Sequence, residues 1–530
     1  MKINKSIIKA VFSLLLIGST VTCTSNYENL NENPYDVTDE EMERDAYNIS
    51  AALVGMQSWV IPTDVNTCQF IECLMGGSWG GYFADSNAGF NAGKFSTFNQ
   101  PDNWNKVMMA DIVPNIYTFQ QKLKEATTDV VPLAIGDIIK VASYHRVVDS
   151  YGPTPYSQIG KDGKLQAPYD SQQEAYNAMF KDLDAAIAAL TARRTETISS
   201  DADKIFAGSV EKWIKFANSL KLRLAMRIVY ADPATAQAKA EEAVNHEVGT
   251  MTDVSDNAML SSFGKDGNPF YKIMYVYNAG DTHVGADITT LMSSYNDPRC
   301  AAYFTQTKFT AEDKITNGYF GLRSGIRIPA AAITSKYSNA NITPSTPVQW
   351  MNAAEIAFLK AEGALRGWNM GGTAESFYRQ GVTLSFTQWG ASGVDAYLAD
   401  AKSLPQAYVD PLGTFNFSGM PSKITIAWNE AADFETNLER IITQKWIANF
   451  MISQEAWTEY RRTGYPKLMP VVLNQSAGGV VTSALGARRL AYPLDEYTTN
   501  TENVNAAVAN YLNGPDNMAT NVWWDCKPKN

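Results

Sequence analysis

Aromatic rings gather in a polar stretch of the sequence that lacks the spacing of a helix face. In residues 78–104 (SWGGYFADSNAGFNAGKFSTFNQPDNW), tryptophan, tyrosine and phenylalanine alternate with glycine, serine and asparagine. Flat apolar rings beside amide side chains suit sugars, because sugar rings have apolar C–H faces and hydroxyl groups that need hydrogen-bond partners. They suit peptides nearly as well. The alternative, that most of these rings belong to the core, stays open because large aromatic side chains are usually buried.

Candidate ligand-binding positions follow from composition, loop placement and approximate position. They are Trp79, Tyr82, Phe83, Trp104, Tyr275 and Tyr277. We expect these rings to stack against a ligand while nearby asparagine, glutamine and aspartate side chains form hydrogen bonds.

Sequence patterns of catalysis are missing. The three histidines, His145, His246 and His283, are scattered, and the sequence has no nucleophile elbow, phosphate loop or dinucleotide fingerprint. A glycosidase needs two carboxylates facing each other across a cleft. The chain has 55 acidic residues, but no motif marks such a pair. Glu355 and Glu362 lie two turns apart on a predicted helix, and we interpret them as a solvated face or as ion-pairing residues of the scaffold.

Metal and disulfide signals are weak. The sequence contains no calcium-loop motif, although Asp85, Asn87 and Asn91 supply oxygen atoms that could bind a structural calcium ion. We expect no cofactor and no catalytic metal. Cys68 and Cys73 could form a disulfide in an oxidising compartment or remain buried thiols. The spacing of all the cysteines is too irregular to predict a disulfide framework.

The N-terminus predicts export and a lipid anchor. Three lysines precede a short apolar run, VFSLLLI (11–17), which is too short to span a bilayer as a helix. Cys23 follows at the distance expected of a bacterial lipoprotein signal. We therefore predict a signal peptide over residues 1–22 and a lipidated Cys23 that opens a polar tether over residues 23–40. An ordinary secretory signal with an incidental cysteine is the alternative.

Length and charge set further bounds. The net charge of −11 and the pI near 5.0 argue against nucleic acid, whose phosphates would be repelled. No later stretch is apolar enough over about 18 residues to form a membrane helix. No low-complexity linker follows residue 40, so we predict a single domain over residues 41–530.

Helical signals supply the scaffold that must position the loops. The pattern Ser171-x-x-Glu174 is a capping box, and Ala353, Ala357, Ala361 and Ala364 form a seam of small residues that favours close helix packing. Helices are predicted over about residues 171–190, 211–230, 232–244, 353–368, 375–390, 437–451, 454–462 and 504–512.

Long irregular segments separate these helices, at residues 74–106, 250–350 and 405–430. Loops of this length are uncommon in a compact domain unless they are functional. The predicted fold is therefore mainly α, with a helical scaffold and an irregular, loop-rich ligand-binding half.

Several motifs follow one another across most of the chain. They are ASYHRVVDSYGPTPYSQ (142–158), WIKFANSLKLRLAMR (213–227), YNDPR (295–299), AAEIAFLKAEGALRGW (353–368), QKWIANFMISQEAWTEYRRTGYP (444–466), RRLAYPLDE (488–496) and VWWD (522–525). Taken together, they resemble the SusD/RagB family of nutrient-binding outer-membrane lipoproteins of Bacteroidetes-type bacteria.

This resemblance implies a tetratricopeptide-like scaffold that is anchored by lipid on the outer face of the outer membrane, at the cell surface. It also implies a partner, a SusC-like TonB-dependent barrel, over which the lipoprotein acts as a lid. The usual ligands implied are oligosaccharides, and some members resemble peptide binders. We interpret the family-marking residues as scaffold or barrel-facing surface and not as ligand site. They are Trp446, Trp457, Arg461, Arg462, Gly464, Tyr465 and Pro466.

The leading hypothesis is a non-catalytic lipoprotein that captures oligosaccharides and delivers them to the barrel. A peptide-binding lid is the alternative within the same class. A secreted glycoside hydrolase would instead require a carboxyl pair about 5–10 Å apart in an aromatic cleft. A purely structural subunit that seals the barrel would bind no ligand without it.

Overall fold

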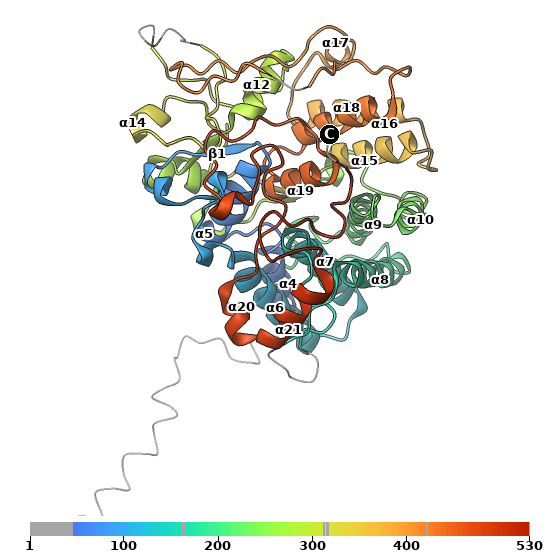
Figure 1. Ribbon diagram of the computed structural model, residues 1–530. Coiled ribbons are helices and arrows are strands. Elements are labelled where there is room, and N and C mark those ends of the chain that lie inside the picture. Colours follow the sequence, from blue (N-terminus) through green and yellow to red (C-terminus); the bar gives the residue numbers. More distant parts are fainter. Residues whose placement is uncertain (1–45, 161–165, 311–312, 314–316, 420–421, 529–530) are drawn as a thin grey trace, which may run out of the picture. The chain divides into compact units, whose positions relative to one another are not determined.

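Helices packed in hairpins build most of the fold, which confirms the prediction of a mainly α protein with a tetratricopeptide-like scaffold (Figure 1). The computed structural model describes residues 46–530 except 161–165, 311–312, 314–316, 420–421 and 529–530. The predicted signal peptide, the lipidated Cys23 and the tether over 23–40 lie outside the described residues. Residues 49–530 form one compact unit.

The elements have the following bounds. The longer helices are α4 (Tyr47–Gln57), the π-helix η2 (Gln69–Gly77), α6 (Val113–Ala126), α7 (Val130–Tyr151), α8 (Gln172–Thr191), α9 (Val210–Arg227), α10 (Pro233–Val244), α12 (Ala286–Ser294), α15 (Ala353–Leu365), α16 (Ala374–Gln388), α18 (Phe434–Ala448), α19 (Ser453–Thr463) and α21 (Thr501–Tyr511). Short helices include α5 (Val65–Cys68), η3 (Ala88–Ala92), α11 (Pro269–Tyr271), the π-helix η10 (Lys272–Val276), η11 (Tyr277–Ala279), α13 (Cys300–Tyr303), α14 (Ala331–Thr334), α17 (Val394–Leu398), η13 (Ala477–Gly479) and α20 (Leu494–Thr499). The strands are β1 (Phe83–Asp85), β2 (Ala258–Leu260), β3 (Thr282–Val284) and β4 (Val348–Met351).

Local capping chemistry sets the helix ends. Helix α8 begins with the predicted capping box, in which the Glu174 N–H donates to the Ser171 hydroxyl and the Ser171 N–H donates to the Glu174 carboxylate. Helix α10 begins at Pro233, with the Asp232 side chain as its N-cap. Helix α19 ends at Thr463 and is capped by Gly464, whose φ of 83° is a left-handed conformation that glycine adopts without strain. The sequence pattern therefore predicts these boundaries well.

The hairpins stack side by side. Helix α7 packs against α8, α9 against α10, α15 against α16, and α18 against both α15 and α16 (Figure 1). Ala353, Ala357 and Ala361 of the predicted small-residue seam are buried. A Cβ atom added to Gly381 of α16 would lie 2.7 Å from the Phe358 ring of α15. Small residues on both helices therefore permit the close approach, as the seam predicts.

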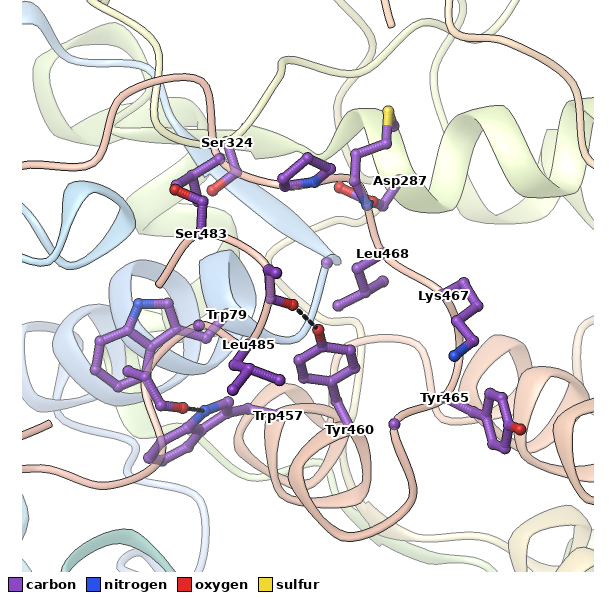
Figure 2. A pocket seen from close by; sticks show the side chains of 18 of the residues that line it. Trp79, Asp287, Ser324, Trp457, Tyr460, Tyr465, Lys467, Leu468, Ser483 and Leu485 are labelled. Carbon is purple, nitrogen blue, oxygen red and sulfur yellow. Dashed lines mark hydrogen bonds between the residues drawn. The ribbon is translucent and has the colours of Figure 1, made fainter. Parts of the chain in front are cut away.

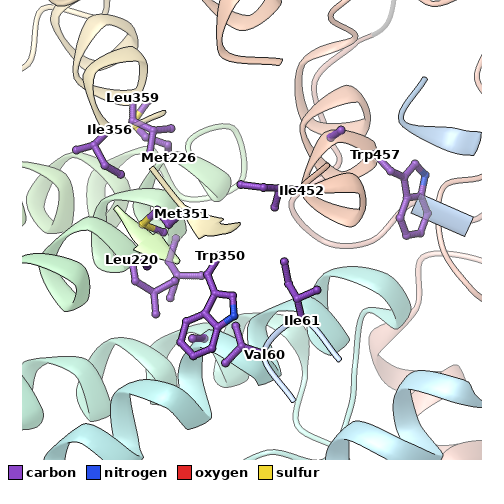
Figure 3. Close-up of a cluster of buried hydrophobic side chains, with 14 of the residues drawn as sticks. Val60, Ile61, Leu220, Met226, Trp350, Met351, Ile356, Leu359, Ile452 and Trp457 are labelled. Atoms are coloured by element: carbon purple, nitrogen blue, oxygen red, sulfur yellow. The ribbon is translucent and has the colours of Figure 1, made fainter. Parts of the chain in front are cut away.

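The hydrophobic core joins segments that are distant in the sequence. Figure 3 shows Val60 and Ile61 after α4, Leu220 of α9, Trp350 of β4 and Ile452 before α19 converging on one cluster. Each of these side chains is 3% exposed or less. Full burial of one such side chain contributes about 1.5–3 kcal/mol, so this cluster fixes the scaffold against the N-terminal helices.

Buried ion pairs also connect the hairpins. Arg223 of α9 donates two hydrogen bonds of 2.7 Å to Glu355 of α15. Arg462 of α19 donates to both carboxylate oxygens of Glu362, at 2.8 and 2.7 Å. Both glutamates are fully buried. Of the interpretations of Glu355 and Glu362, the ion-paired scaffold is therefore correct and the solvated face is wrong.

Arg227 is the centre of a second buried charge cluster. Its guanidinium, fully buried, lies 3.4 Å from Asp149 and donates to Glu455 at 2.6 Å and to Glu459 at 3.0 Å. Burial raises the pKa of Glu455, but Arg227 and Arg223 outweigh this effect and hold it at about 2. Burial raises the pKa of Asp149. The cluster ties α9 to α7 and α19 through Arg227 and its carboxyl partners.

Short strands order the irregular half. Strand β1 pairs antiparallel with β3, and β2 pairs antiparallel with β4 with a register irregularity between Ala258 and Met259.

Cys68, Cys73 and Cys300 are buried free thiols. Within the described ranges, no helix combines the length and the apolar character needed to cross a membrane.

Candidate ligand-binding site

The two aromatic segments selected from the sequence meet at the β1–β3 pair. Asp85 lies opposite Thr282 in the antiparallel register. Beyond this pair, the Ser86 N–H donates to the Asp281 carbonyl oxygen at 2.9 Å and the Ser86 hydroxyl donates to the Gly280 carbonyl oxygen at 2.8 Å. The loop that follows β1 and the loop that precedes β3 therefore share one edge.

A single buried carboxylate holds both loops. Asp281 is 3% exposed. It accepts hydrogen bonds from Gln69 Nε2 at 2.7 Å and from Asn87 Nδ2 at 2.7 Å. The Asn278 amide also donates to it, at 3.0 Å. Because hydrogen bonds to a charged group contribute about 1.5–3 kcal/mol each, this Asp281 clamp fixes the loop surface before any ligand arrives.

Tyr275 and Tyr277 lie partly exposed on the loop that ends at the clamp. The rings of Tyr271 and Tyr275 stack with centroids 5.1 Å apart and planes inclined by 24°. The Tyr275 hydroxyl donates to the Ala340 carbonyl oxygen at 2.5 Å, which fixes the ring orientation. Tyr275 therefore offers ring surface to the solvent from a fixed position, and Tyr277 lies partly exposed beside it in the sequence.

The turn after Tyr277 is strained. Asn278 and Ala279 have φ angles of 48° and 64°, which side chains with a Cβ rarely adopt. Gly280 follows with a φ of 112°, and a Cβ there would lie 2.7 Å from the Met274 carbonyl oxygen. Such strain persists only where the surroundings fix the backbone, and it is frequent at ligand sites. Here the Asp281 clamp supplies that constraint.

Trp104 is also partly exposed and belongs to the same half. Its ring lies 5.0 Å from Phe70, 5.6 Å from Phe95 and 5.8 Å from Phe90, measured between centroids. Phe70 follows Gln69 in η2, and Phe90 lies in η3 just after Asn87, so both neighbours belong to segments that the Asp281 clamp holds. Trp104 is therefore placed beside the clamped loops.

Tyr82 and Phe83 do not fit the expectation of ligand contact. Both are 0% exposed. The Tyr82 ring stacks on Trp446 at 5.1 Å, and the Phe83 ring packs against Phe450 at 5.9 Å. Strand β1 is buried on both faces, so a ring in this glycine-rich stretch can point only into the core. These two rings have no surface for a ligand.

Trp79 lines a large cavity. It is 6% exposed, its ring lies 4.8 Å from Trp457, and its indole N–H donates to the Phe95 carbonyl oxygen at 2.9 Å. The cavity has a volume of about 1000 Å³ and lies between α19, the end of η2 and two loop segments, residues 464–471 and 483–488 (Figure 2). This volume is at the upper end of the range of about 300–1000 Å³ for small-molecule sites.

The expected cation ligands hold loops in place. Ser96 donates to Asp85, and burial raises the pKa of Asp85 to about 6. Asn87 contributes to the Asp281 clamp, and Asn91 exchanges hydrogen bonds with the backbone of Ile328 at 2.9 and 2.8 Å. In the part of the chain that the structure covers, no group of three histidine, cysteine or acidic side chains is placed to hold a metal ion.

The histidines are neutral at physiological pH. Burial lowers the pKa of His145 to about 3 and that of His283 to about 4. His246 lies near the surface, and desolvation lowers its pKa as well.

The family-marking residues have mixed positions. Arg461 stacks on Trp457, and the Trp446 indole N–H donates to the Gly80 carbonyl oxygen, so these groups support the scaffold as expected. Trp457, Gly464 and Tyr465, however, also line the cavity, together with Tyr460 and Lys467. Sequence reasoning missed this cavity, and the aromatic pair that flanks the helix-ending glycine is the signal that could have indicated it.

Helical hairpins that carry ordered aromatic loops define a helical-repeat protein whose candidate ligand groups lie outside the repeats. The model of the SusD-like family, described as Susd and RagB outer membrane lipoprotein, matches residues 29–525, so the chain belongs to this family. The resemblance drawn from the sequence motifs is thus confirmed.

Solved structures of relatives share the fold. A SusD homolog from Bacteroides uniformis is 51% identical, with 91% of this chain and 100% of that chain covered and a TM-score of 0.87. A SusD homolog from Bacteroides ovatus is 42% identical, with 91% and 100% covered and a TM-score of 0.86. A chitin-binding SusD homolog from Flavobacterium johnsoniae is 37% identical, with 91% and 99% covered and a TM-score of 0.85. The comparison with curated proteins found no significant match.

Proposed function

We propose that the chain is a cell-surface lipoprotein that binds oligosaccharides without cleaving them and delivers them to a SusC-like TonB-dependent transporter. The observation that carries the proposal is the partly exposed pair Tyr275 and Tyr277 on a loop that the Asp281 clamp fixes. Membership of the SusD-like family and a chitin-binding relative at 37% identity support the choice of carbohydrate.

Binding requires only stacking and hydrogen bonds. The exposed parts of Tyr275, Tyr277 and Trp104 offer flat apolar surface to the C–H faces of sugar rings. Asn278 is exposed in the adjoining turn, and its amide donates to Asp281. Because the clamp already orders these loops, binding costs little conformational entropy. Affinity should nevertheless be modest, since the ligand must leave for the transporter.

Anchoring would depend on Cys23. A lipid chain contributes about 0.8 kcal/mol per buried CH₂ group, and more than one chain is needed for a stable anchor. Replacing Cys23 by serine should release the protein from the outer membrane, which fractionation of cells would detect. A Cys23→Ser protein that stays with the envelope would contradict the lipid anchor.

Calorimetry with the purified chain tests ligand binding. We expect heat of binding with at least one oligosaccharide of a panel derived from chitin, starch and xylan, and recovery of that saccharide intact. Tyr277→Ala should weaken the binding of that saccharide. Tyr511→Ala, which removes an exposed ring from α21, should leave it unchanged. Binding of peptides and of no saccharide would reject the sugar assignment, and cleavage of the saccharide would reject a passive binder.

Delivery has its own test. A tagged chain purified from detergent-solubilised outer membranes should bring with it a TonB-dependent barrel that mass spectrometry identifies. Purification of the membrane-bound chain alone would contradict a stable complex.

A further inference from the structure

The cavity shown in Figure 2 is separate from the aromatic loop surface. Trp104, Tyr275 and Tyr277 are not among the residues that line it. Its walls come from α19, the end of η2, α12 and the loop segments 464–471 and 483–488. The cavity is therefore a candidate for a second binding function.

The ring walls present apolar surface. The indole N–H of Trp79 donates to Phe95 and that of Trp457 donates to the Ala487 carbonyl oxygen at 2.9 Å. The Tyr460 hydroxyl donates to the Ala484 carbonyl oxygen at 3.1 Å. With these polar atoms already engaged, the rings can offer only their faces and edges to a guest.

Two hydroxyl groups in the walls have no partner among the described residues. Ser78 and Ser324 are 6% and 7% exposed, and neither Oγ atom forms a hydrogen bond within the described chain. Unsatisfied buried hydroxyls are uncommon because each costs about 1–3 kcal/mol. Both Oγ atoms are sealed from solvent, so they lie within the wall and not on the surface that a guest would touch.

Charged groups complete the polar lining, among them Asp287, Lys467 and the ion pair of Lys527 with Glu435 at 2.6 Å. Asp287 is 6% exposed and accepts the Met469 N–H at 2.6 Å. The Lys467 ammonium lies 4.9 Å from the Tyr465 ring centroid and forms no ion pair with a described residue. The cavity thus combines aromatic rings with groups that can accept and donate hydrogen bonds (Figure 2).

The backbone of the loop segments argues against a peptide guest. The carbonyl oxygens of Ala484 and Ala487 accept from Tyr460 and Trp457, and that of Leu485 accepts from Arg488. A peptide that binds as an added strand needs a free row of backbone groups. A purely apolar guest fits no better, because it would cover the Asp287 carboxyl and the Lys467 ammonium without giving either one a hydrogen bond.

We propose that this cavity is a second saccharide site, which binds one end of an oligosaccharide or a short oligosaccharide independently of the loop surface. The choice of ligand class rests on the proposed function, whereas the location rests on the cavity itself. Sugar rings place their C–H faces on Tyr460 and Tyr465 while their hydroxyl groups bond to Asp287 and Lys467.

Two variants test the site by calorimetry with the saccharides of the same panel. Ala484→Trp adds a ring at an exposed position of the lining, so it should block the cavity without disturbing the packing of the core. Ala477→Trp, exposed on the same loop but outside the lining, is the matched control. Lys467→Ala should weaken the cavity site about fivefold or more, as expected for a lost hydrogen bond to a charged group.

Wild type and Ala477→Trp should bind two molecules of a short oligosaccharide per chain, and Ala484→Trp should bind one. A single site that Ala484→Trp leaves unchanged would overturn the cavity proposal while preserving the proposed function. Binding that Ala484→Trp abolishes and Tyr277→Ala leaves intact would preserve the cavity and overturn the loop surface. No saccharide binding by the wild type would overturn both.

Discussion

The helical scaffold and the loop-bearing half both contain buried carboxyl groups, but the net shifts of their pKa values are opposite. In the scaffold, burial raises the pKa of Glu362, but Arg462 and Arg366 outweigh it and hold the pKa at about 2. In the loop-bearing half, burial prevails and raises the pKa of Asp85 and of Asp287 to about 6. Glu362 of the scaffold is therefore held ionised by two arginines, whereas Asp85 and Asp287 of the loop-bearing half form no ion pair with a described residue.

The largest effect should come from breaking a scaffold pair. Glu362→Ala leaves the buried Arg462 without one of its carboxylate partners, and loss of one partner of a buried pair costs about 3–5 kcal/mol. Glu375→Ala removes an exposed pair with Arg379 and should cost at most about 0.5 kcal/mol. Denaturant unfolding measures both. A loss below about 1 kcal/mol for Glu362→Ala would show that the pair does not hold the scaffold.

The opposite pKa shifts predict opposite pH dependence. Glu362 has a lowered pKa, so its contribution to stability is present above its ordinary pKa and is lost as the pH falls toward 2. Asp287 has a raised pKa, so the folded state binds its proton more tightly than the unfolded state does. Its ionisation therefore lowers stability as the pH rises from about 4 to about 6.

Asp287→Asn should remove that loss. At about 1.4 kcal/mol per pKa unit, the variant should be about 2–3 kcal/mol more stable than the wild type at pH 7.5 and about equal to it at pH 4. Unfolding at a series of pH values measures the difference. A constant difference across the series would contradict the raised pKa of Asp287.

On the loop surface, affinity should change more than stability does. Tyr277→Ala removes a partly exposed ring, so we expect the saccharide affinity to fall about tenfold, or about 1.4 kcal/mol. The unfolding free energy should change by at most about 0.5 kcal/mol, as for surface substitutions. Calorimetry and denaturant unfolding of the same preparation separate the two quantities. A large loss of stability would mean that Tyr277 belongs to the scaffold.

The smallest expected effect comes from loosening the Asp281 clamp. Asn87→Ala removes one of three amide donors, and we expect a loss of about 1 kcal/mol in stability. Saccharide affinity should fall a few-fold because the loops are less well ordered. Asn503→Ala on α21, which removes an amide remote in sequence from the clamp, is the control. Unchanged affinity for Asn87→Ala would show that the clamp does not preorganise the site.

Local signals predict the scaffold but not the placement of the rings. The capping box at Ser171, the Asp232-Pro233 start and the alanine seam at Ala353 each act within one or two turns of a helix, so the sequence predicts them. The prediction that Tyr82 and Phe83 contact a ligand is wrong because composition shows only that a ring lies in an irregular segment. It does not show which way the ring points. The pairing of β1 with the distant β3 decides that question.

The cavity and the clamp were not predicted for the same reason. Asp281 gathers amides from Gln69, Asn87 and Asn278, and no periodic pattern relates the first two positions to the third. The cavity walls likewise come from segments around Trp79, Tyr460 and Ala484 that only the tertiary fold brings together.

The most direct test is a crystal structure of the chain with a bound oligosaccharide. We predict an intact saccharide with a ring stacked on Tyr277 or Tyr275 beside the turn at Asn278. A saccharide bound only on the outer faces of the helical hairpins, or one cleaved in the crystal, would contradict passive capture by the aromatic loops.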